Sequence, residues 1–146
     1  MIRTSIASPQ EIVKLAFPQL REVSRVVLEG EGIKEAKISL AFVDDATIHG
    51  INKRFLNHDE PTDVITFPLS GAAKKLEGEL VIGVEVALRQ AAERGHAVEA
   101  ELSLYVIHGL LHLCGYDDKK PKDAAAMRVK ERQYLQTLGL PAISGD

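Results

Sequence analysis

The spacing of apolar residues divides the chain into helical and extended segments. From Ser8 to Val27 the apolar positions recur at helical intervals. Ser8 is a candidate N-cap, Pro9 suits the first helical position, and Pro18 is expected to kink the helix. Further helices are predicted over residues 46–55, 85–94, 98–114 and 122–138.

Short apolar and β-branched runs mark the strands. Residues 38–43 read ISLAFV, which predicts a strand buried on both faces. Residues 64–67 and 79–82 predict two more strands, the first ended by Pro68, and residues 2–6 can add a fourth. This order predicts an α+β (α/β layered) fold, with a small mixed sheet of about four strands covered by about five helices.

Length and composition indicate one folded domain spanning residues 1–146. Hydrophobic residues make up 45% and charged residues 27%, which excludes a disordered or low-complexity chain. A single cysteine excludes an internal disulfide and a Cys-rich zinc site. No apolar run reaches the roughly 20 residues that cross a bilayer, and no signal-peptide pattern opens the chain, so we expect a cytoplasmic protein without membrane contact. The net charge of −3 gives no bulk support for binding nucleic acid.

The segment 108–118, HGLLHLCGYDD, carries the strongest chemical signal and lies in the C-terminal half. His108 and His112 lie one turn apart on one helix face, so both imidazoles can reach one ion. Gly115 allows a sharp turn, after which Asp118 can fold back toward the rings. Two imidazoles and one carboxylate match several catalytic zinc sites, which leave a position for water. The alternatives are a hydrogen-bonded histidine pair and solvated turn carboxylates at Asp117 and Asp118.

The same spacing overlaps the zinc-peptidase pattern H-E-x-x-H-x-x-G-x-x-H. Gly109 replaces its catalytic glutamate and Asp118 its third histidine. A peptidase would therefore need a base from elsewhere, such as Glu79 or Asp117. Two histidines and a carboxylate also form the triad of non-haem iron oxygenases, although those usually use H-x-D spacing on a β-barrel. Both functions are weaker hypotheses.

The segment 108–118 resembles the signature H-G-x-L-H-L-x-G-Y-D-H of the YbeY family of bacterial metal-dependent endoribonucleases. Residues 59–68, DEPTDVITFP, look like the family's D-x-x-T-D-V-L-S-F-P segment. Residues 77–82, EGELVI, are similar to its L-G-D-I-x-I strand. The family's closing helix is matched by Met127, Glu131 and residues 138–140.

The resemblance implies a zinc site and an RNA substrate. His108 and His112 match the family's first two zinc ligands, and Asp118 stands where the family has a third histidine. One zinc ion per chain is implied. The implied activity is a single-strand-specific endoribonuclease in 16S rRNA 3′-end maturation and ribosome quality control. Its implied partners are rRNA and the ribosomal small subunit or its proteins.

A second departure concerns the residues that assist catalysis. The family usually has an arginine after an aromatic residue, but here Phe55 is followed by Leu56. Arg54 is a candidate substitute, and Glu79 and Asp117 are further catalytic candidates beside a metal-bound water. The competing hypothesis is a ribosome-associated RNA- or protein-binding factor whose metal is structural.

Other polar residues have ordinary structural interpretations. Thr62 and Asp63 are expected to cap a loop through bonds to the backbone. Glu79 is either an edge residue in water or a partner of a ligating imidazole. Cys114 is expected in the core. The remaining histidines, expected at the surface, are His49, His58 and His96.

Overall fold

The computed structural model describes residues 1–58, 62–70 and 75–143. The start of the 59–68 motif lies outside these ranges. The elements are β1 (Ile2–Ala7), α1 (Phe17–Gly30), β2 (Glu35–Val43), α2 (Asp45–Leu56), β3 (Val64–Ser70), β4 (Lys75–Gly83), α3 (Val84–Arg94), α4 (Val98–Leu113) and α5 (Pro121–Thr137). The predicted α+β fold, with a four-stranded mixed sheet and five helices, is confirmed across the described ranges.

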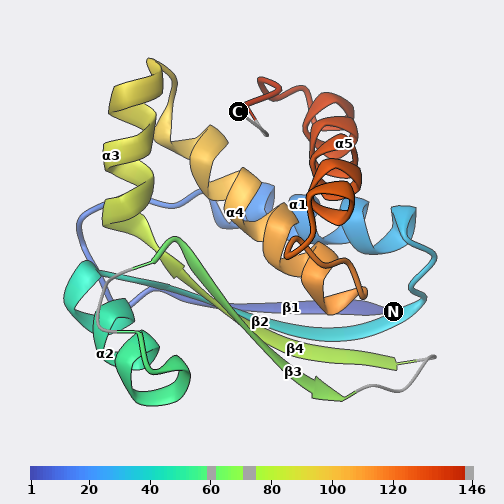
Figure 1. The fold of residues 1–146 in the computed structure, drawn as a ribbon, viewed down its shortest axis with the longest axis horizontal. Helices are drawn as coiled ribbons and strands as arrows, with labels where there is room; N and C mark the ends of the chain where they lie inside the picture. The colour runs from blue at the N-terminus through green and yellow to red at the C-terminus, as the bar shows by residue number, and fades with distance from the viewer. Residues whose placement is uncertain (59–61, 71–74, 144–146) are drawn as a thin grey trace.

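The sheet has the strand order β1-β2-β4-β3. β1, β2 and β4 run parallel, and β3 pairs with β4 in the antiparallel direction. The register aligns Ile6, Leu40 and Leu80, and these residues pack into the main core. Helices α1, α3, α4 and α5 lie above the sheet in Figure 1, whereas α2 lies below it. Ile48 of α2 packs against Ile65 and Val81, so α2 covers part of the opposite sheet face.

Helix α4 runs through the centre of the helical layer (Figure 1). Every residue from Ala100 to Ile107 is buried, because the sheet and the neighbouring helices enclose the helix. Near its end, Gly109 lets the helix lie close on β4. A Cβ atom at Gly109 would stand 2.8 Å from the side chain of Leu80. This close packing fixes the end of α4 that carries both histidines of the HGLLH segment.

The first helix begins later than predicted. The expected start at Ser8 is wrong, because α1 begins at Phe17, and Pro18 lies in its first turn. Proline fits there because an amide at that position has no helical partner. The Gln10 side-chain oxygen accepts the Ile12 and Val13 amides at 2.7 and 2.8 Å. A local side-chain turn therefore replaces the helix upstream.

Helices α2 to α5 begin and end within one residue of their predicted bounds. Asp44 caps α2, because its carboxylate accepts the Thr47 amide at 2.8 Å. The expected end of β3 at Pro68 is wrong, because the strand continues to Ser70 with a register shift between them. An edge strand tolerates proline, since one side of it needs no ladder bonds. Of the helices in the described ranges, none combines the length and apolar character needed to cross a bilayer.

Candidate metal site and its surroundings

Three side chains converge where α4 ends. His108, His112 and Asp118 each offer one ligand atom, and these atoms lie within 4.8 Å of one another. The two Nε2 atoms are 3.1 Å apart. Asp118 Oδ2 lies 3.4 Å from His108 Nε2 and 3.6 Å from His112 Nε2. Residues from the helix and from the turn after it thus meet as the spacing predicted.

The turn after α4 returns the chain toward the rings. Gly115 adopts a φ of +105°, which a side-chain-bearing residue rarely adopts. The Gly115 and Tyr116 amides donate to carbonyl groups of the last helical turn, the arrangement of a Schellman motif. Asp117 Oδ1 accepts the amides of Asp118 and the next residue. Asp117 therefore stabilises the turn, and Asp118 reaches the histidines.

The Nδ1 atom of each imidazole already has a partner. His108 Nδ1 donates to Glu131 Oε2 of α5 at 2.5 Å, and His112 Nδ1 donates to the Tyr116 carbonyl at 3.0 Å. These bonds place the proton on Nδ1 and leave a lone pair on each Nε2. Two lone pairs facing each other beside a carboxylate repel one another unless a cation lies between them. The donor set therefore fits a metal ion.

The local charges favour a cation at this position. Burial opposes the charged form of His108, but the hydrogen bond to Glu131 and the charges of Glu131, Asp63 and Asp118 outweigh burial and raise the pKa of His108. The imidazoles are 28% and 26% exposed and Asp118 is 44% exposed. The site is thus electronegative and open on one side, so an ion and a substrate can both reach it.

Comparison with known proteins agrees with this geometry. A statistical description of the family "Endoribonuclease YbeY" matches residues 6–139. The chain belongs to the YbeY family. It is 42% identical to "Endoribonuclease YbeY" of Pelotomaculum thermopropionicum, covering 83% of this chain and 85% of that one. It is 40% identical to the protein of that name from Macrococcus caseolyticus, and the match covers 85% of this chain and 86% of the relative. The solution structure of TM1509 from Thermotoga maritima superposes on this structure with a TM-score of 0.66 at 27% identity. The match covers 100% of this chain and 97% of TM1509.

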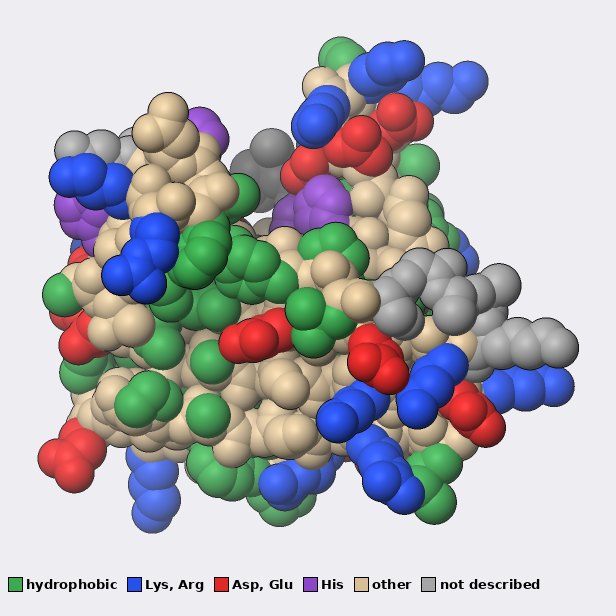
Figure 2. Space-filling model, turned by 90° about the horizontal axis from the view of Figure 1, so that it is seen from below, with side chains coloured by type: hydrophobic (Ala, Val, Ile, Leu, Met, Phe, Trp, Pro, Cys, Tyr) green, Lys and Arg blue, Asp and Glu red, His purple; other side chains and the backbone are tan. Residues whose placement is uncertain are grey.

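A hollow of about 480 Å³ lies along β3 beside the candidate site of this YbeY-family chain. Both histidines form part of its wall, together with Lys119 and residues of β3. Leu56 also lines it, at the position where the family usually has arginine. Figure 2 shows histidine side chains at the surface with acidic and basic side chains grouped beside them. The groove therefore joins an apolar wall to a polar end.

Two catalytic candidates, Glu79 and Arg54, do not line the groove that both histidines line. Gly78 and Leu80 face α4, so Glu79 between them points to the opposite sheet face. It stands in β4, which has neighbours on both sides and is not an edge strand. Arg54 is exposed near the end of α2, with its guanidinium carbon 5.8 Å from the centre of the Phe55 ring.

The residue that sequence reasoning missed is Glu131. It appeared only as a match to the closing helix, whereas the structure places its buried carboxylate on His108. A partner 23 positions away leaves no local pattern. The expectation that His96 is exposed is wrong, because its side chain is 12% exposed and pairs with Glu101. Cys114 is partly buried as expected, and burial together with the Glu31 charge raises the pKa of its thiol to about 11.

Asp63 makes the predicted capping contact. Its Oδ1 accepts the Val64 amide at 2.8 Å at the start of β3. The same residue lines both the groove along β3 and a second hollow that His108 also lines. The loop cap therefore also contributes charge near the candidate metal site.

Proposed function

We propose that this protein is a zinc-dependent endoribonuclease that cuts single-stranded RNA. The observation that carries the proposal is the convergence of two imidazole Nε2 atoms and the Asp118 carboxylate at an open surface. Three protein donors leave a further coordination position, as catalytic zinc sites do and structural ones do not. The names of the curated relatives agree with this activity.

The residues at the candidate metal site have separate roles in the proposed reaction. A zinc ion held by His108, His112 and Asp118 would supply Lewis acidity toward a phosphate oxygen and lower the pKa of a coordinated water. Glu131 holds His108 in the tautomer that presents Nε2 outward. Lys119, at the groove wall, is placed to pair with a phosphate next to the cut.

The groove favours an unpaired strand. Its apolar wall includes Leu56, Val64 and Leu113, which can contact the faces of unstacked bases. We propose rRNA as the substrate, in 16S rRNA 3′-end maturation and ribosome quality control in the cytoplasm. The net charge of −3 gives only weak general attraction to RNA. We therefore propose that contact with the ribosomal small subunit or its proteins holds this protein next to its RNA substrate.

A binding role without cleavage is the second candidate. Leu56 gives the groove an apolar side chain where the family usually supplies a positive charge. In that alternative the metal would be structural, and its removal would unfold the protein. The cleavage proposal instead predicts that chelation leaves the fold intact, because α4 is enclosed by other elements over most of its length.

The test is cleavage of end-labelled single-stranded and duplex RNA by the zinc-loaded protein. We expect the wild type to cut the single strand. In His108→Ala the cleavage rate should fall by a factor of about 100 or more, with an unchanged thermal midpoint. His49→Ala, on the other side of the sheet, is the matched control and should cut normally. An intact RNA with zinc-loaded wild type, together with unfolding on chelation, would support the binding alternative.

A further inference from the structure

The carboxylate of Glu31 is distant from the candidate metal site in sequence but connected to it in the fold. Glu31 is the residue that ends α1, and its side chain is 11% exposed. Its Oε2 atom accepts a hydrogen bond from the Tyr134 hydroxyl of α5. Lys130 Nζ, also of α5, lies 3.5 Å from the same oxygen. The end of α1 is therefore held against one face of α5.

Gly30 makes the contact with Tyr134 possible. A Cβ atom at this position would stand 2.6 Å from both Cε1 and the hydroxyl oxygen of Tyr134, a distance that real Cβ atoms do not show. Because glycine has no side chain, the Tyr134 ring lies across the end of α1 and its hydroxyl reaches the next residue, Glu31. Gly30 and Glu31 thus form one contact surface for the tyrosine.

The Glu31 carboxylate also acts on the turn that follows α4. Burial, and then the hydrogen bond to Glu31 and its charge, raise the pKa of Tyr116 to about 12, so the Tyr116 hydroxyl keeps its proton and can donate. The charge of Glu31 also helps to raise the pKa of the Cys114 thiol at the end of α4. One carboxylate therefore receives two tyrosine hydroxyls, one from α5 and one from the turn.

Tyr116 supports two of the three candidate ligands. Its carbonyl accepts the Nδ1 proton of His112 at 3.0 Å, and its amide donates to the Leu111 carbonyl at 3.0 Å. Asp118 follows two residues later, and its Oδ2 lies 3.6 Å from His112 Nε2. A displacement of Tyr116 would therefore move both the partner of the His112 ring and the Asp118 carboxylate.

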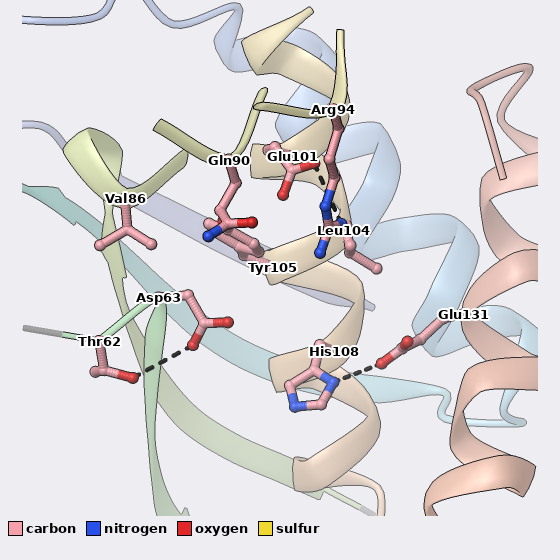
Figure 3. Close-up of a pocket in the computed structure, with 10 residues that line it drawn as sticks. All are labelled: Thr62, Asp63, Val86, Gln90, Arg94, Glu101, Leu104, Tyr105, His108 and Glu131. Atoms are coloured by element: carbon pink, nitrogen blue, oxygen red, sulfur yellow. Dashed lines mark hydrogen bonds and ion pairs between the residues drawn. The ribbon is translucent and has the colours of Figure 1, made fainter. Parts of the chain in front are cut away.

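Tyr134 lies beside the support of the third ligand. It follows Glu131 by three residues in α5, which places both side chains on one face of the helix. Figure 3 shows the Glu131 carboxylate directed from α5 at His108, and the bond to His108 Nδ1 is 2.5 Å long. By binding Tyr134, Glu31 fixes the face of α5 that orients His108.

A structural tie between α1 and α5 needs only Tyr134 and Lys130. The additional interaction with Tyr116 sets the position of the turn relative to α5. That relation matters most at the metal site, because ligands must be held within about 0.5 Å of their working geometry. The two histidine Nε2 atoms, supported from α5 and from the turn respectively, are 3.1 Å apart.

We propose that Glu31 is a positioning residue of the metal site, acting through the hydroxyls of Tyr116 and Tyr134. It holds the turn that carries Asp118 beside the face of α5 that carries Glu131. Glu31 is not one of the three donors, yet loss of its carboxylate weakens zinc binding. The proposal rests on the zinc site of the function proposed above and is independent of which RNA is cut.

The first experiment measures zinc affinity by competition with a coloured chelator. Glu31→Ala should weaken zinc binding by at least ~10-fold. Glu29→Ala, which removes an exposed carboxylate from the same end of α1, is the matched control and should change the affinity by less than ~2-fold. Wild-type affinity in a folded Glu31→Ala protein would overturn the proposal. An equal loss in Glu29→Ala would also overturn it, because general negative charge would then explain the effect.

The second experiment tests the route through Tyr116. Tyr116→Phe removes one hydroxyl and should lower zinc affinity by about 3- to 10-fold. The double variant Glu31→Ala/Tyr116→Phe should bind zinc as Glu31→Ala does, because the two changes break one contact. Fully additive losses would overturn this route. If Glu31→Ala does not fold, Glu31→Gln replaces it in both experiments, with a loss in the same direction expected.

The third experiment separates positioning from stability. Cobalt(II) in place of zinc gives an absorption spectrum that reports the donor set and its geometry. The cobalt spectrum of Glu31→Ala should move toward that of Asp118→Ala, whereas the spectrum of Glu29→Ala should match the wild type. A Glu31→Ala protein with a lowered thermal midpoint but a wild-type cobalt spectrum would show a merely structural role and overturn the proposal.

Failure of the proposed function is distinguishable from failure of this inference. If the wild-type protein takes up no metal, the zinc-dependent function fails, and the ring ¹⁵N NMR shifts of His112 decide the inference separately. We expect the Nδ1–H tautomer in the wild type and a mixture of tautomers in Glu31→Ala, because the Tyr116 carbonyl no longer keeps its place. The same tautomer in both proteins would contradict the role of Glu31.

Discussion

Two histidine–glutamate pairs flank the length of α4 and behave differently. His96 pairs with Glu101 through Nε2, and these side chains are 12% and 1% exposed. His108 pairs with Glu131 through Nδ1, and its ring is 28% exposed. In the first pair, Nε2 of His96 bonds to Glu101, which ties the connection between α3 and α4 to the first turn of α4. The second leaves Nε2 directed toward His112 and Asp118. The ring nitrogen that pairs with the glutamate therefore differs between the histidine of the candidate metal site and the histidine of the α3–α4 connection.

The largest expected difference between the pairs is in metal content. His108→Ala should lose nearly all bound zinc, because it removes one of three donors from the site. His96→Ala should retain zinc, although it removes a buried partner of Glu101 and should lower stability. Zinc per chain after dialysis measures both. Equal metal loss in the two variants would remove the distinction between the pairs.

The thiol of Cys114 tests whether position on the helix separates the metal face from the core. Its pKa of about 11 lies above the ordinary value of 9.0. Because only the thiolate reacts, alkylation of the folded protein at pH 8 should be roughly 100-fold slower than in denaturant. The rate should rise with pH through 11 if the fold persists. Rapid labelling at pH 8 would show that Cys114 is exposed.

Glu131→Gln tests the role of the buried carboxylate behind His108. A glutamine still accepts the Nδ1 proton but carries no charge, so zinc affinity should fall by about 10- to 100-fold. Competition with a coloured chelator measures the affinity. Glu101→Gln is the matched control at the other pair and should leave zinc affinity unchanged. Unaltered affinity in Glu131→Gln would mean that the carboxylate does not support the site.

Gly109→Ala tests whether close packing on β4 fixes the metal-binding end of α4. The new methyl group would meet the buried Leu80 side chain at 2.8 Å, which should cost about 1–3 kcal/mol of unfolding free energy. Gly50→Ala, in α2 with open space around it, should instead stabilise by about 0.5–1 kcal/mol. Denaturant unfolding measures both. A neutral Gly109→Ala would show that this end of α4 adjusts easily.

The sequence predicted local features well and long-range partners poorly. The interval between His108 and His112 and the glycine before Asp118 act over one or two turns, so their geometry could be read directly. Glu131 could not be assigned, because its contact with His108 depends on how α5 packs beside α4. The prediction that His96 is exposed failed for a related reason, because the residue pairs with Glu101. Their pairing follows from the burial of the first turn of α4, which polar neighbours in the sequence conceal.

The same limit applies to the start of α1 and to Glu79. Helical periodicity upstream of Pro18 was real, but the Gln10 side chain bonds that backbone in another conformation. For Glu79, the strand was predicted correctly, whereas the face it presents depends on which residues of β4 pack under α4. Register and packing direction are properties of the assembled sheet, and one strand's sequence leaves them open.

Elemental analysis of the purified protein, with Asp118→Ala beside it, tests the central claim most directly. We predict about one zinc per wild-type chain and a large loss in Asp118→Ala with the fold intact. Asp118→His, which restores the family's third histidine, should retain the metal. A folded wild-type protein that takes up no metal when zinc is supplied would contradict the account of His108, His112 and Asp118 as a metal site.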